Sequence, residues 1–177
     1  MKIIMLFLLL ALFAGCEYNN LDNNNSPVIE RERLYGQEHI MSMPYEELSE
    51  NEILALGMAI DDEYKARATY YSVIEKFGEV RPFISIVESE ENHIERLIEL
   101  YNKYNLEIPE DNWKGYQVEY GTLKEACIGG VNAELDNVEL YEYLFEIIEN
   151  EDISTVFKSL RDASFYNHLP AFERCAR

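Results

Sequence analysis

Apolar residues recur at steps of three and four along the chain, the spacing that one face of an α-helix produces. The first such segment follows a capping box, Ser49-Glu50-Asn51-Glu52, and stops at Gly78. The second starts near Pro82, which suits a first helical turn, and ends near Tyr104. Their apolar positions are Ile53, Leu56, Ile60, Tyr70, Ile74 and Phe77, then Phe83, Ile86, Val87, Ile94, Leu97 and Tyr101. The short link predicts a helical hairpin.

A second hairpin is predicted in the C-terminal part of the chain. Thr122-Leu123-Lys124-Glu125 is another capping box, Asp152 or Ser154 can begin the last helix, and Pro170 predicts a kink in it. The apolar positions are Cys127, Val131, Val138, Tyr141, Phe145 and Ile148, then Ile153, Phe157, Leu160, Phe172 and Cys175. The longer link from Leu106 to Gly121 can cross between the hairpins. The pattern predicts an all-α antiparallel four-helix bundle with one crossover connection.

The N-terminus has a different pattern. A lysine precedes an apolar run from Ile3 to Ala14, which is shorter than the roughly 20 residues of a membrane-spanning helix. We therefore predict a signal peptide over residues 1–15, with a permanent anchor helix as the alternative. Phe13-Ala14-Gly15-Cys16 resembles a bacterial lipoprotein signal, which implies that Cys16 is acylated and begins the mature chain. The protein is thus expected to be exported and membrane-anchored, in the periplasm or at the cell surface.

The segment from Glu17 to Pro27 is rich in asparagine and has no hydrophobic period, while the pattern from Val28 to Glu47 is undecided. We predict that residues 16–47 form a flexible tether that leads to a folded domain over residues 48–177. The formal net charge is −19, with 34 acidic and 15 basic side chains. This excess of negative charge argues against binding to nucleic acid. Most acidic residues fit the solvated outer faces of the helices, so only those in step with the apolar positions need another explanation.

Ionisable residues interrupt the apolar face in each of the four segments. Glu63, for example, lies at helical spacing between Ile60 and Tyr70. The ionisable residues that share the apolar face of their segment in this way are Glu63, Glu90, His93, Glu134 and His168. Unpaired charge in a core costs several kcal/mol or more, so these groups need a compensating partner. Carboxylate oxygen and imidazole nitrogen are suitable ligands for iron, with manganese or zinc as alternatives. We therefore predict a buried metal site.

An α-helix rises roughly 1.5 Å per residue, so the position of each ligand candidate along the bundle axis can be estimated from its distance in sequence to the nearest turn. Glu134 lies before the end of the third helical segment, and His168 lies about the same number of residues after the start of the fourth. In an antiparallel pair the two residues should therefore lie at the same level. The first hairpin fits less well, because Glu63 is offset from Glu90 and His93 by roughly 5 to 9 Å.

Several of these residues also have a simpler interpretation. Glu90 followed three residues later by His93 is a pattern that is common by chance on an acidic helix. Glu63 can pair with Arg67 one turn further on, and His168 can be a hydrogen-bonded core histidine. Tyr70 and Tyr141 follow Glu63 and Glu134 by seven residues, which is compatible with core packing or with hydrogen bonds to ligand carboxylates. Arg67 is a further candidate neighbour of the ligands. His39, outside the predicted domain, is assigned no role.

At these residues the chain resembles the ferritin-like superfamily. Glu63-Tyr64-Lys65-Ala66-Arg67-Ala68-Thr69-Tyr70 and Glu90-Glu91-Asn92-His93 are similar to the metal-ligand helices of rubrerythrins. The stretch from about Leu48 to Arg174 is similar to the family called domain of unknown function 2202, including Gly130-Val131-x-Ala133-Glu134 and Asn167-His168-Leu169-x-Ala171-Phe172. The resemblance implies an up-and-down bundle and the five ligands named above. It also implies a glutamate three residues before His168, where this chain has Phe165.

Two functional hypotheses follow. The first is a di-iron-type oxidoreductase that oxidises Fe(II) or reduces peroxide or oxygen, with Glu90 bridging two ions. The second is a non-enzymatic lipoprotein for metal storage, scaffolding or partner binding, which Phe165 favours. Catalytic residues are not identified by the sequence, and neither is an electron donor. A homo-oligomer is left open. No Ser or Cys lies at a plausible spacing from a His, so a nucleophilic enzyme is not indicated.

Two cysteines remain once Cys16 is acylated. Cys127 lies seven residues before Glu134, and Cys175 lies seven after His168, so the two should be level in an antiparallel pair. Small neighbours at Ala126, Gly130, Ala171 and Ala176 permit the helices to approach closely. Export places the thiols where disulfides persist, so we predict a Cys127–Cys175 bridge, with two buried free thiols as the alternative.

Overall fold

Capping residues set both ends of the first helix. The structure is a computed structural model that describes residues 47–177. In α2, Glu50–Phe77, the Ser49 hydroxyl accepts a hydrogen bond from the Glu52 N–H, while the Glu52 carboxylate accepts one from the Ser49 N–H at 2.8 Å. The helix ends at Gly78, whose φ of 85° is rarely adopted by residues with a Cβ. Both ends agree with the prediction.

Three further helical rods follow α2, and no strand occurs among the described residues. They are α3, Phe83–Lys103, α4, Leu123–Ile147, and a last rod made of α5, Glu151–Ala163, the π-helical turn η1, Ser164–His168, and α6, Leu169–Cys175. The predicted start of the last rod at Asp152 or Ser154 is wrong. The Asn150 side chain accepts hydrogen bonds from the N–H groups of Asp152 and Ile153, so α5 starts earlier.

The last rod changes its helical form next to its proline. The Leu169 N–H donates to the Ser164 carbonyl, a spacing of five residues that defines a π turn. Pro170 follows directly, in the first turn of α6. Proline lacks an N–H and its ring collides with the carbonyl four residues earlier in a regular helix. Where the sequence predicts a kink at Pro170, the structure has a π turn that directly precedes the proline.

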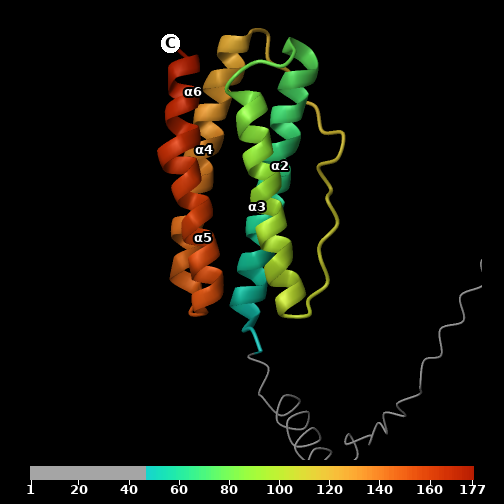
Figure 1. The fold of residues 1–177 in the computed structure, drawn as a ribbon, viewed down its shortest axis with the longest axis vertical. Coiled ribbons are helices and arrows are strands. Elements are labelled where there is room, and N and C mark those ends of the chain that lie inside the picture. Colours follow the sequence, from blue (N-terminus) through green and yellow to red (C-terminus); the bar gives the residue numbers. More distant parts are fainter. Residues whose placement is uncertain (1–46) are drawn as a thin grey trace, which may run out of the picture. The chain divides into compact units, whose positions relative to one another are not determined.

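The chain forms a four-helix bundle (Figure 1). In that view α2 leads upward and α3 returns beside it, then the link after α3 runs back up along the outside, so that α4 also starts at the top. The link is attached to α2: Asp111 forms an ion pair with Arg67, and the indole N–H of Trp113 donates to Asp61 at 2.9 Å. α4 and the last rod form the second pair.

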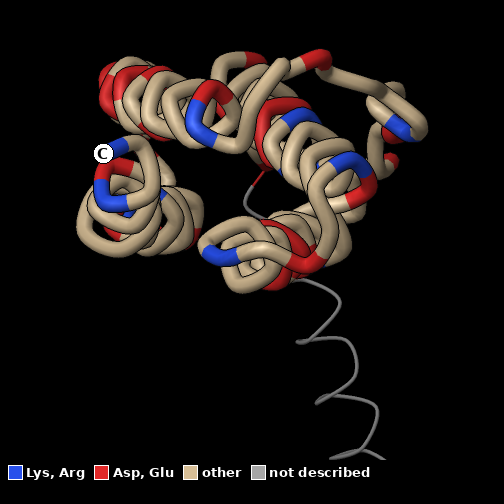
Figure 2. Tube along the Cα trace, turned by 90° about the horizontal axis from the view of Figure 1, so that it is seen from above, with Lys and Arg blue, Asp and Glu red and all other residues tan. Residues whose placement is uncertain are grey.

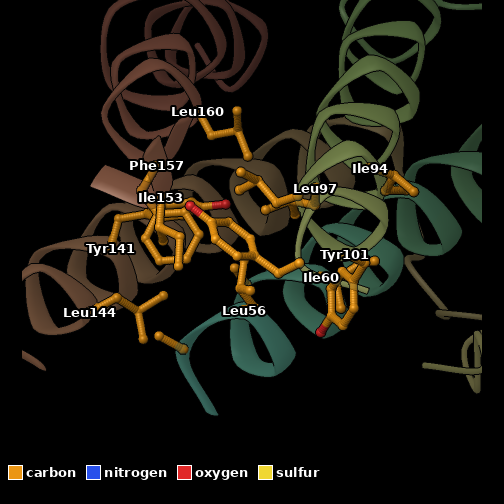
Figure 3. Packing of buried hydrophobic residues seen from close by; sticks show 14 of the residues in the cluster. Leu56, Ile60, Ile94, Leu97, Tyr101, Tyr141, Leu144, Ile153, Phe157 and Leu160 are labelled. Carbon is orange, nitrogen blue, oxygen red and sulfur yellow. The ribbon is translucent and has the colours of Figure 1, made fainter. Parts of the chain in front are cut away.

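Apolar side chains form two separate clusters. The larger cluster, drawn in Figure 3, includes Leu56, Ile60, Leu97, Tyr141, Phe157 and Leu160. The second includes Tyr70, Val73, Phe83, Val87, Cys127 and Phe172. Most of the apolar residues predicted to face inward belong to or contact one of these clusters. Ile53 is an exception, because 42% of its surface is exposed.

Charged residues occur along all the helices of the bundle (Figure 2). Figure 2, which looks along the helices, shows acidic positions in all parts of the bundle and fewer basic ones. Within residues 47–177, none of the helices combines the length and the apolar character that crossing a membrane requires. The predicted signal peptide, Cys16, most of the tether and His39 lie outside the described residues.

Candidate metal centre

The candidate centre lies between the two apolar clusters. On each rod the ionisable residue stands between members of different clusters: on α2, Glu63 lies between Ile60 of the larger cluster and Tyr70 of the second. The same holds for Glu90 and His93 on α3, Glu134 on α4 and His168 at the end of η1. All five side chains are buried, each with at most 5% of its surface exposed. Apolar layers above and below therefore limit water access.

The first part of the centre joins α2 to α3. Nδ1 of His93 lies 3.1 Å from Oε2 of Glu63 and 2.9 Å from Oε2 of Glu90. The height offset expected between these two helices does not separate them. Glu63 meets His93, which lies almost one turn further along α3 than Glu90 and thus closer to its level.

The second part joins α3 to α4 and the last rod. Nδ1 of His168 lies 3.2 Å from Oε1 of Glu90 and 3.3 Å from Oε2 of Glu134. The two imidazole rings are stacked, with centroids 5.5 Å apart and planes inclined by 23°. Glu90 thus presents one carboxylate oxygen to each histidine. It is the shared member of two groups, Glu63–Glu90–His93 and Glu90–Glu134–His168.

Two tyrosines hold the outer carboxylates in a crosswise arrangement. Tyr141 on α4 donates to Oε1 of Glu63 at 2.7 Å, and Tyr70 on α2 donates to Oε1 of Glu134 at 2.5 Å. Burial, together with the adjoining carboxylate, raises the pKa of both tyrosines well above 10, so each phenol keeps the proton that it donates. Each outer glutamate therefore turns its second oxygen, Oε2, toward a histidine.

Removing the Tyr141 hydroxyl should weaken the half of the centre that contains Glu63. In Tyr141→Phe, Asn137 would remain as a side-chain donor to Oε1 of Glu63 within residues 47–177, at the longer distance of 3.4 Å. We expect the free energy of unfolding to fall by about 1.5 to 3 kcal/mol, the usual contribution of a hydrogen bond to a charged group. Metal affinity should fall about tenfold at the Glu63 half and be unchanged at the Glu134 half, as measured by metal titration. Tyr70→Phe is the matched control and should show the reverse pattern.

Two polar residues of the centre were not predicted. The Ser89 hydroxyl lies 3.3 Å from Nε2 of His93 and 3.0 Å from Nε2 of His168, so one side chain contacts both rings. Asn137 donates to Asp62 at 2.8 Å in addition to its longer contact with Glu63. Both lie in step with ligand candidates, Ser89 four residues before His93 and Asn137 three after Glu134. That spacing was the available signal. The expectation that no Ser lies at a plausible spacing from a His is therefore wrong for Ser89.

Electrostatics favour protonated histidines in the metal-free protein. Burial lowers the pKa of His93, but Glu63 and Glu90 outweigh burial and raise it to about 10. Burial likewise lowers the pKa of His168, while Glu134 and Glu90 raise it to about 9. For Glu90, the two histidines outweigh burial and lower its pKa, whereas burial and the Glu90 charge raise the pKa of Glu63. Two imidazolium ions therefore balance two of the three carboxylates.

Comparison with known proteins places the chain in a family. Residues 52–127 match the family described as "Uncharacterized protein domain (DUF2202)". Uncharacterized protein MJ0754 of Methanocaldococcus jannaschii is 30% identical over 156 residues, which cover 77% of this chain and 81% of that protein. The chain belongs to the DUF2202 family. The crystal structure of hypothetical protein MJ0754 has a TM-score of 0.66 and 26% identity to this DUF2202 chain, covering 76% of it and 85% of the relative.

The resemblance places Phe165 at the position of a fourth-helix ligand, and this placement is wrong. In a regular helix the residue three before His168 would face the centre, but the π turn adds a residue to this stretch. Phe165 is consequently 45% exposed, and Ser164 is the buried residue one turn before His168. Phe165 of the DUF2202 chain therefore does not occupy a ligand position. The two halves of the centre have the same composition: one outer glutamate, one histidine and the shared Glu90.

Phe165→Glu should leave metal binding unchanged, contrary to what the sequence alone suggests. The new carboxylate would lie on the outer side of η1, away from Glu90 and His168. We expect the stoichiometry of metal binding to be that of the wild-type DUF2202 protein, and the affinity to agree with it within about twofold. The reason is that residue 165 would contact neither a ligand nor a residue that hydrogen-bonds to one. An affinity gain of tenfold or more at either half would contradict the placement of this side chain.

Arg67 does not contact the predicted ligands. Its guanidinium pairs with Asp111 of the link and lies over the Tyr64 ring, 5.2 Å from the centroid. The interpretation in which Arg67 neutralises Glu63 is therefore wrong. In this DUF2202 chain Arg67 holds the crossover link against α2, while Glu63 obtains its partners from α3 and α4.

The predicted disulfide is present. Cys127 and Cys175 are bonded, with their Cα atoms 5.6 Å apart. A Cβ on Gly130 would lie 2.5 Å from the Phe172 ring, so this glycine is needed for the close approach of α4 and α6. The bridge ties the start of α4 to the end of α6 in the DUF2202 fold, two turns from Glu134 and His168.

Proposed function

We propose that this chain is a ferritin-like metal-binding protein that holds two divalent transition-metal ions in the centre of its bundle. The observation that carries the proposal is the pair of buried groups that share Glu90. In each group, one ligand atom from each residue lies within 4.8 Å of the others. This separation is about twice the ~2.0–2.2 Å length of a metal–oxygen or metal–nitrogen bond, so one ion could be bound by all three atoms of a group. The path of the chain, two helical pairs joined by a crossover, supports a ferritin-like arrangement.

The donor set fits such ions. Three carboxylates and two imidazoles offer only oxygen and nitrogen ligands, which suit iron, manganese and zinc. Oε1 of Glu90 is buried and accepts no hydrogen bond of normal geometry from the described residues. Its neighbour is Nδ1 of His168 at 3.2 Å, so the His168 proton balances this oxygen in the metal-free protein, and a metal ion would take the place of that proton. We assign Glu63, Glu90 and His93 to one ion, and Glu90, Glu134 and His168 to the other.

We propose iron as the physiological metal and Fe(II) oxidation, or reduction of oxygen or peroxide, as the activity. Bound iron would supply electrons by cycling between its ferrous and ferric states. The protein residues contribute position: Tyr70 and Tyr141 orient the outer carboxylates, Ser89 contacts both imidazoles, and the apolar clusters flank the centre on two sides. The non-enzymatic alternative is favoured by Ser164, because the last rod offers a hydroxyl rather than a fourth carboxylate at its inward position.

Oxygen-dependent oxidation of added Fe(II) tests the activity. The full-length protein should oxidise Fe(II) faster than the protein-free buffer, and the Glu63→Ala and His93→Ala variants should not. Retained metal without acceleration would favour metal storage or partner binding. Metal analysis of untagged protein from its own compartment identifies the ion.

Metal binding should release protons and strengthen as the pH rises. Because the pKa values of His93 and His168 are raised to about 10 and about 9, both rings carry a proton at pH 7 that a metal must displace. We expect about one proton released per ion at pH 7, and affinity that rises up to about tenfold per pH unit below pH 9. Titration calorimetry in two buffers with different ionisation enthalpies measures the released protons. Affinity that is constant between about pH 6.5 and 8.5 would contradict the protonated state.

We also propose that the protein is exported and anchored through an acyl group on Cys16. The support is the sequence pattern of residues 1–16. Mass spectrometry of the mature N-terminus tests this proposal, and a chain that starts before Cys16 or carries no acyl group contradicts it.

A further inference from the structure

A groove of about 590 Å³ opens between the start of α3 and the η1–α6 segment. Arg81, just before α3, and Arg174, near the end of α6, contribute to its lining, as do Ser89 and His168. In Figure 1 the start of α3 and the C-terminal end lie at the same end of the bundle. The groove therefore leads from two arginines at that end toward the buried centre. Its volume is in the range of small-molecule sites and far exceeds that of one water.

The charge of the groove is opposite to that of the protein. The chain has a net charge of −19, yet the groove lining contains two arginines and neither Asp nor Glu. Arg81 donates to the Ser85 hydroxyl at 3.3 Å. Within residues 47–177 neither arginine forms an ion pair with a carboxylate. Arginines that lack an acidic partner in so acidic a protein are available to bind an external anion.

Between its two ends the groove has an apolar wall. Pro82 and Ile86 line it from the α3 side, and Ala171 and Cys175 line it from α6. At roughly 1.5 Å per residue, the arginines are about 10 Å from the level of Ser89 and His168. An occupant with a charged head at the arginines thus has room for an apolar body that extends toward the centre. An inorganic anion alone would leave this wall uncovered.

We propose that the groove binds a small organic anion, with its carboxylate or phosphate head at Arg81 and Arg174 and its apolar body against Pro82, Ile86 and Ala171. The far end of the ligand lies beside Ser89 and His168. This binding site extends beyond the proposed metal function and is present without metal, because the two arginines take no part in the metal centre.

The test uses full-length, metal-free protein and hexanoate as the probe. Hexanoate should bind with one-to-one stoichiometry in calorimetry. Arg81→Gln and Arg174→Gln should each weaken it about tenfold, the usual loss for a charge-assisted hydrogen bond. Arg96→Gln is the matched control, since it removes the same charge from α3 at a residue that contacts Ser159 instead. This control should bind hexanoate like the wild type, and all three variants should retain wild-type metal stoichiometry.

Neutral and inorganic probes separate the two parts of the proposal. 1-Hexanol, which has the apolar body without the charge, should bind at least tenfold more weakly, and so should inorganic phosphate. Hexyl phosphate compared with hexanoate identifies the preferred head group, and binding of either supports the site. Equal binding of hexanol and hexanoate, equal binding of phosphate and hexanoate, or unchanged binding by both groove variants overturns it. Because metal is absent from these titrations, a failure of the metal function does not affect the outcome.

Discussion

Replacing Glu90 with glutamine is expected to weaken both metal ions at once. Glu90 gives Oε2 to the group with His93 and Oε1 to the group with His168. Glutamine keeps the size of the side chain but loses the charge that both ions would share. We expect the affinity for each ion to fall by about a hundredfold or more, since changes at residues that merely support a ligand already cost 10- to 100-fold. Titration with Mn²⁺ or Zn²⁺ measures both affinities.

The outer glutamates are the matched controls for Glu90. Glu63→Gln should weaken only the ion that involves His93, and Glu134→Gln only the ion that involves His168. Each variant should therefore retain one ion close to wild-type affinity. Circular dichroism establishes that the bundle is intact in every variant. Loss of a single ion in Glu90→Gln, or loss of both in either control, would contradict the shared carboxylate.

Loss of the Cys127–Cys175 bridge is expected to cause a large loss of stability. The bridge closes a loop with a sequence separation of 48 residues. The chain-entropy model gives a stabilisation of about 4 kcal/mol for such a loop, and a fall in Tm of roughly 10 to 20 °C for a domain of this size. Denaturant unfolding of the Cys127→Ala/Cys175→Ala variant measures the change in free energy.

Reduced wild-type protein separates the bond from the packing of the sulfur atoms. Cys127 is fully buried, so its replacement with alanine also removes van der Waals contacts. The reduced protein keeps both sulfurs and should still lose most of the stabilisation. Identical unfolding midpoints with and without reductant would contradict a stabilising bridge. The bridge also fixes the level of α4 against α6 near the Glu134–His168 contact, so reduction should lower metal affinity at that half.

The helices and their inward faces could be largely predicted from local signals. Ser49 and Thr122 begin capping boxes, and Gly78 ends α2 at the expected residue. The convergent positions of Glu63 and Glu134 follow from helical spacing, because only one face of each helix points inward. The disulfide could be predicted for the same reason, since its cysteines lie two turns from residues on neighbouring helices.

The remaining features depend on tertiary structure. The sequence near Pro170 indicates an irregular helix but not which residue becomes the extra one, so Phe165 was assigned to the wrong face. Ser89 was overlooked because serine in a helix usually faces solvent, and only the packed bundle shows that it contacts two histidines. Spacing alone left open a pair between Arg67 and Glu63, whereas in the folded chain Arg67 pairs with Asp111 of the crossover link.

The π turn η1 also affects how this chain can be compared with its relatives. A π turn holds one residue more than an α turn over nearly the same length, so it is equivalent to an insertion inside a helix. An alignment that treats the last rod as one uninterrupted helix displaces every position on one side of η1 by about 100° of rotation. Ser164 and His168 would then be compared with residues on another face. The fourth helix of relatives without a π turn therefore needs a one-residue gap between Leu160 and His168, and a search for ligands by fixed spacing fails there.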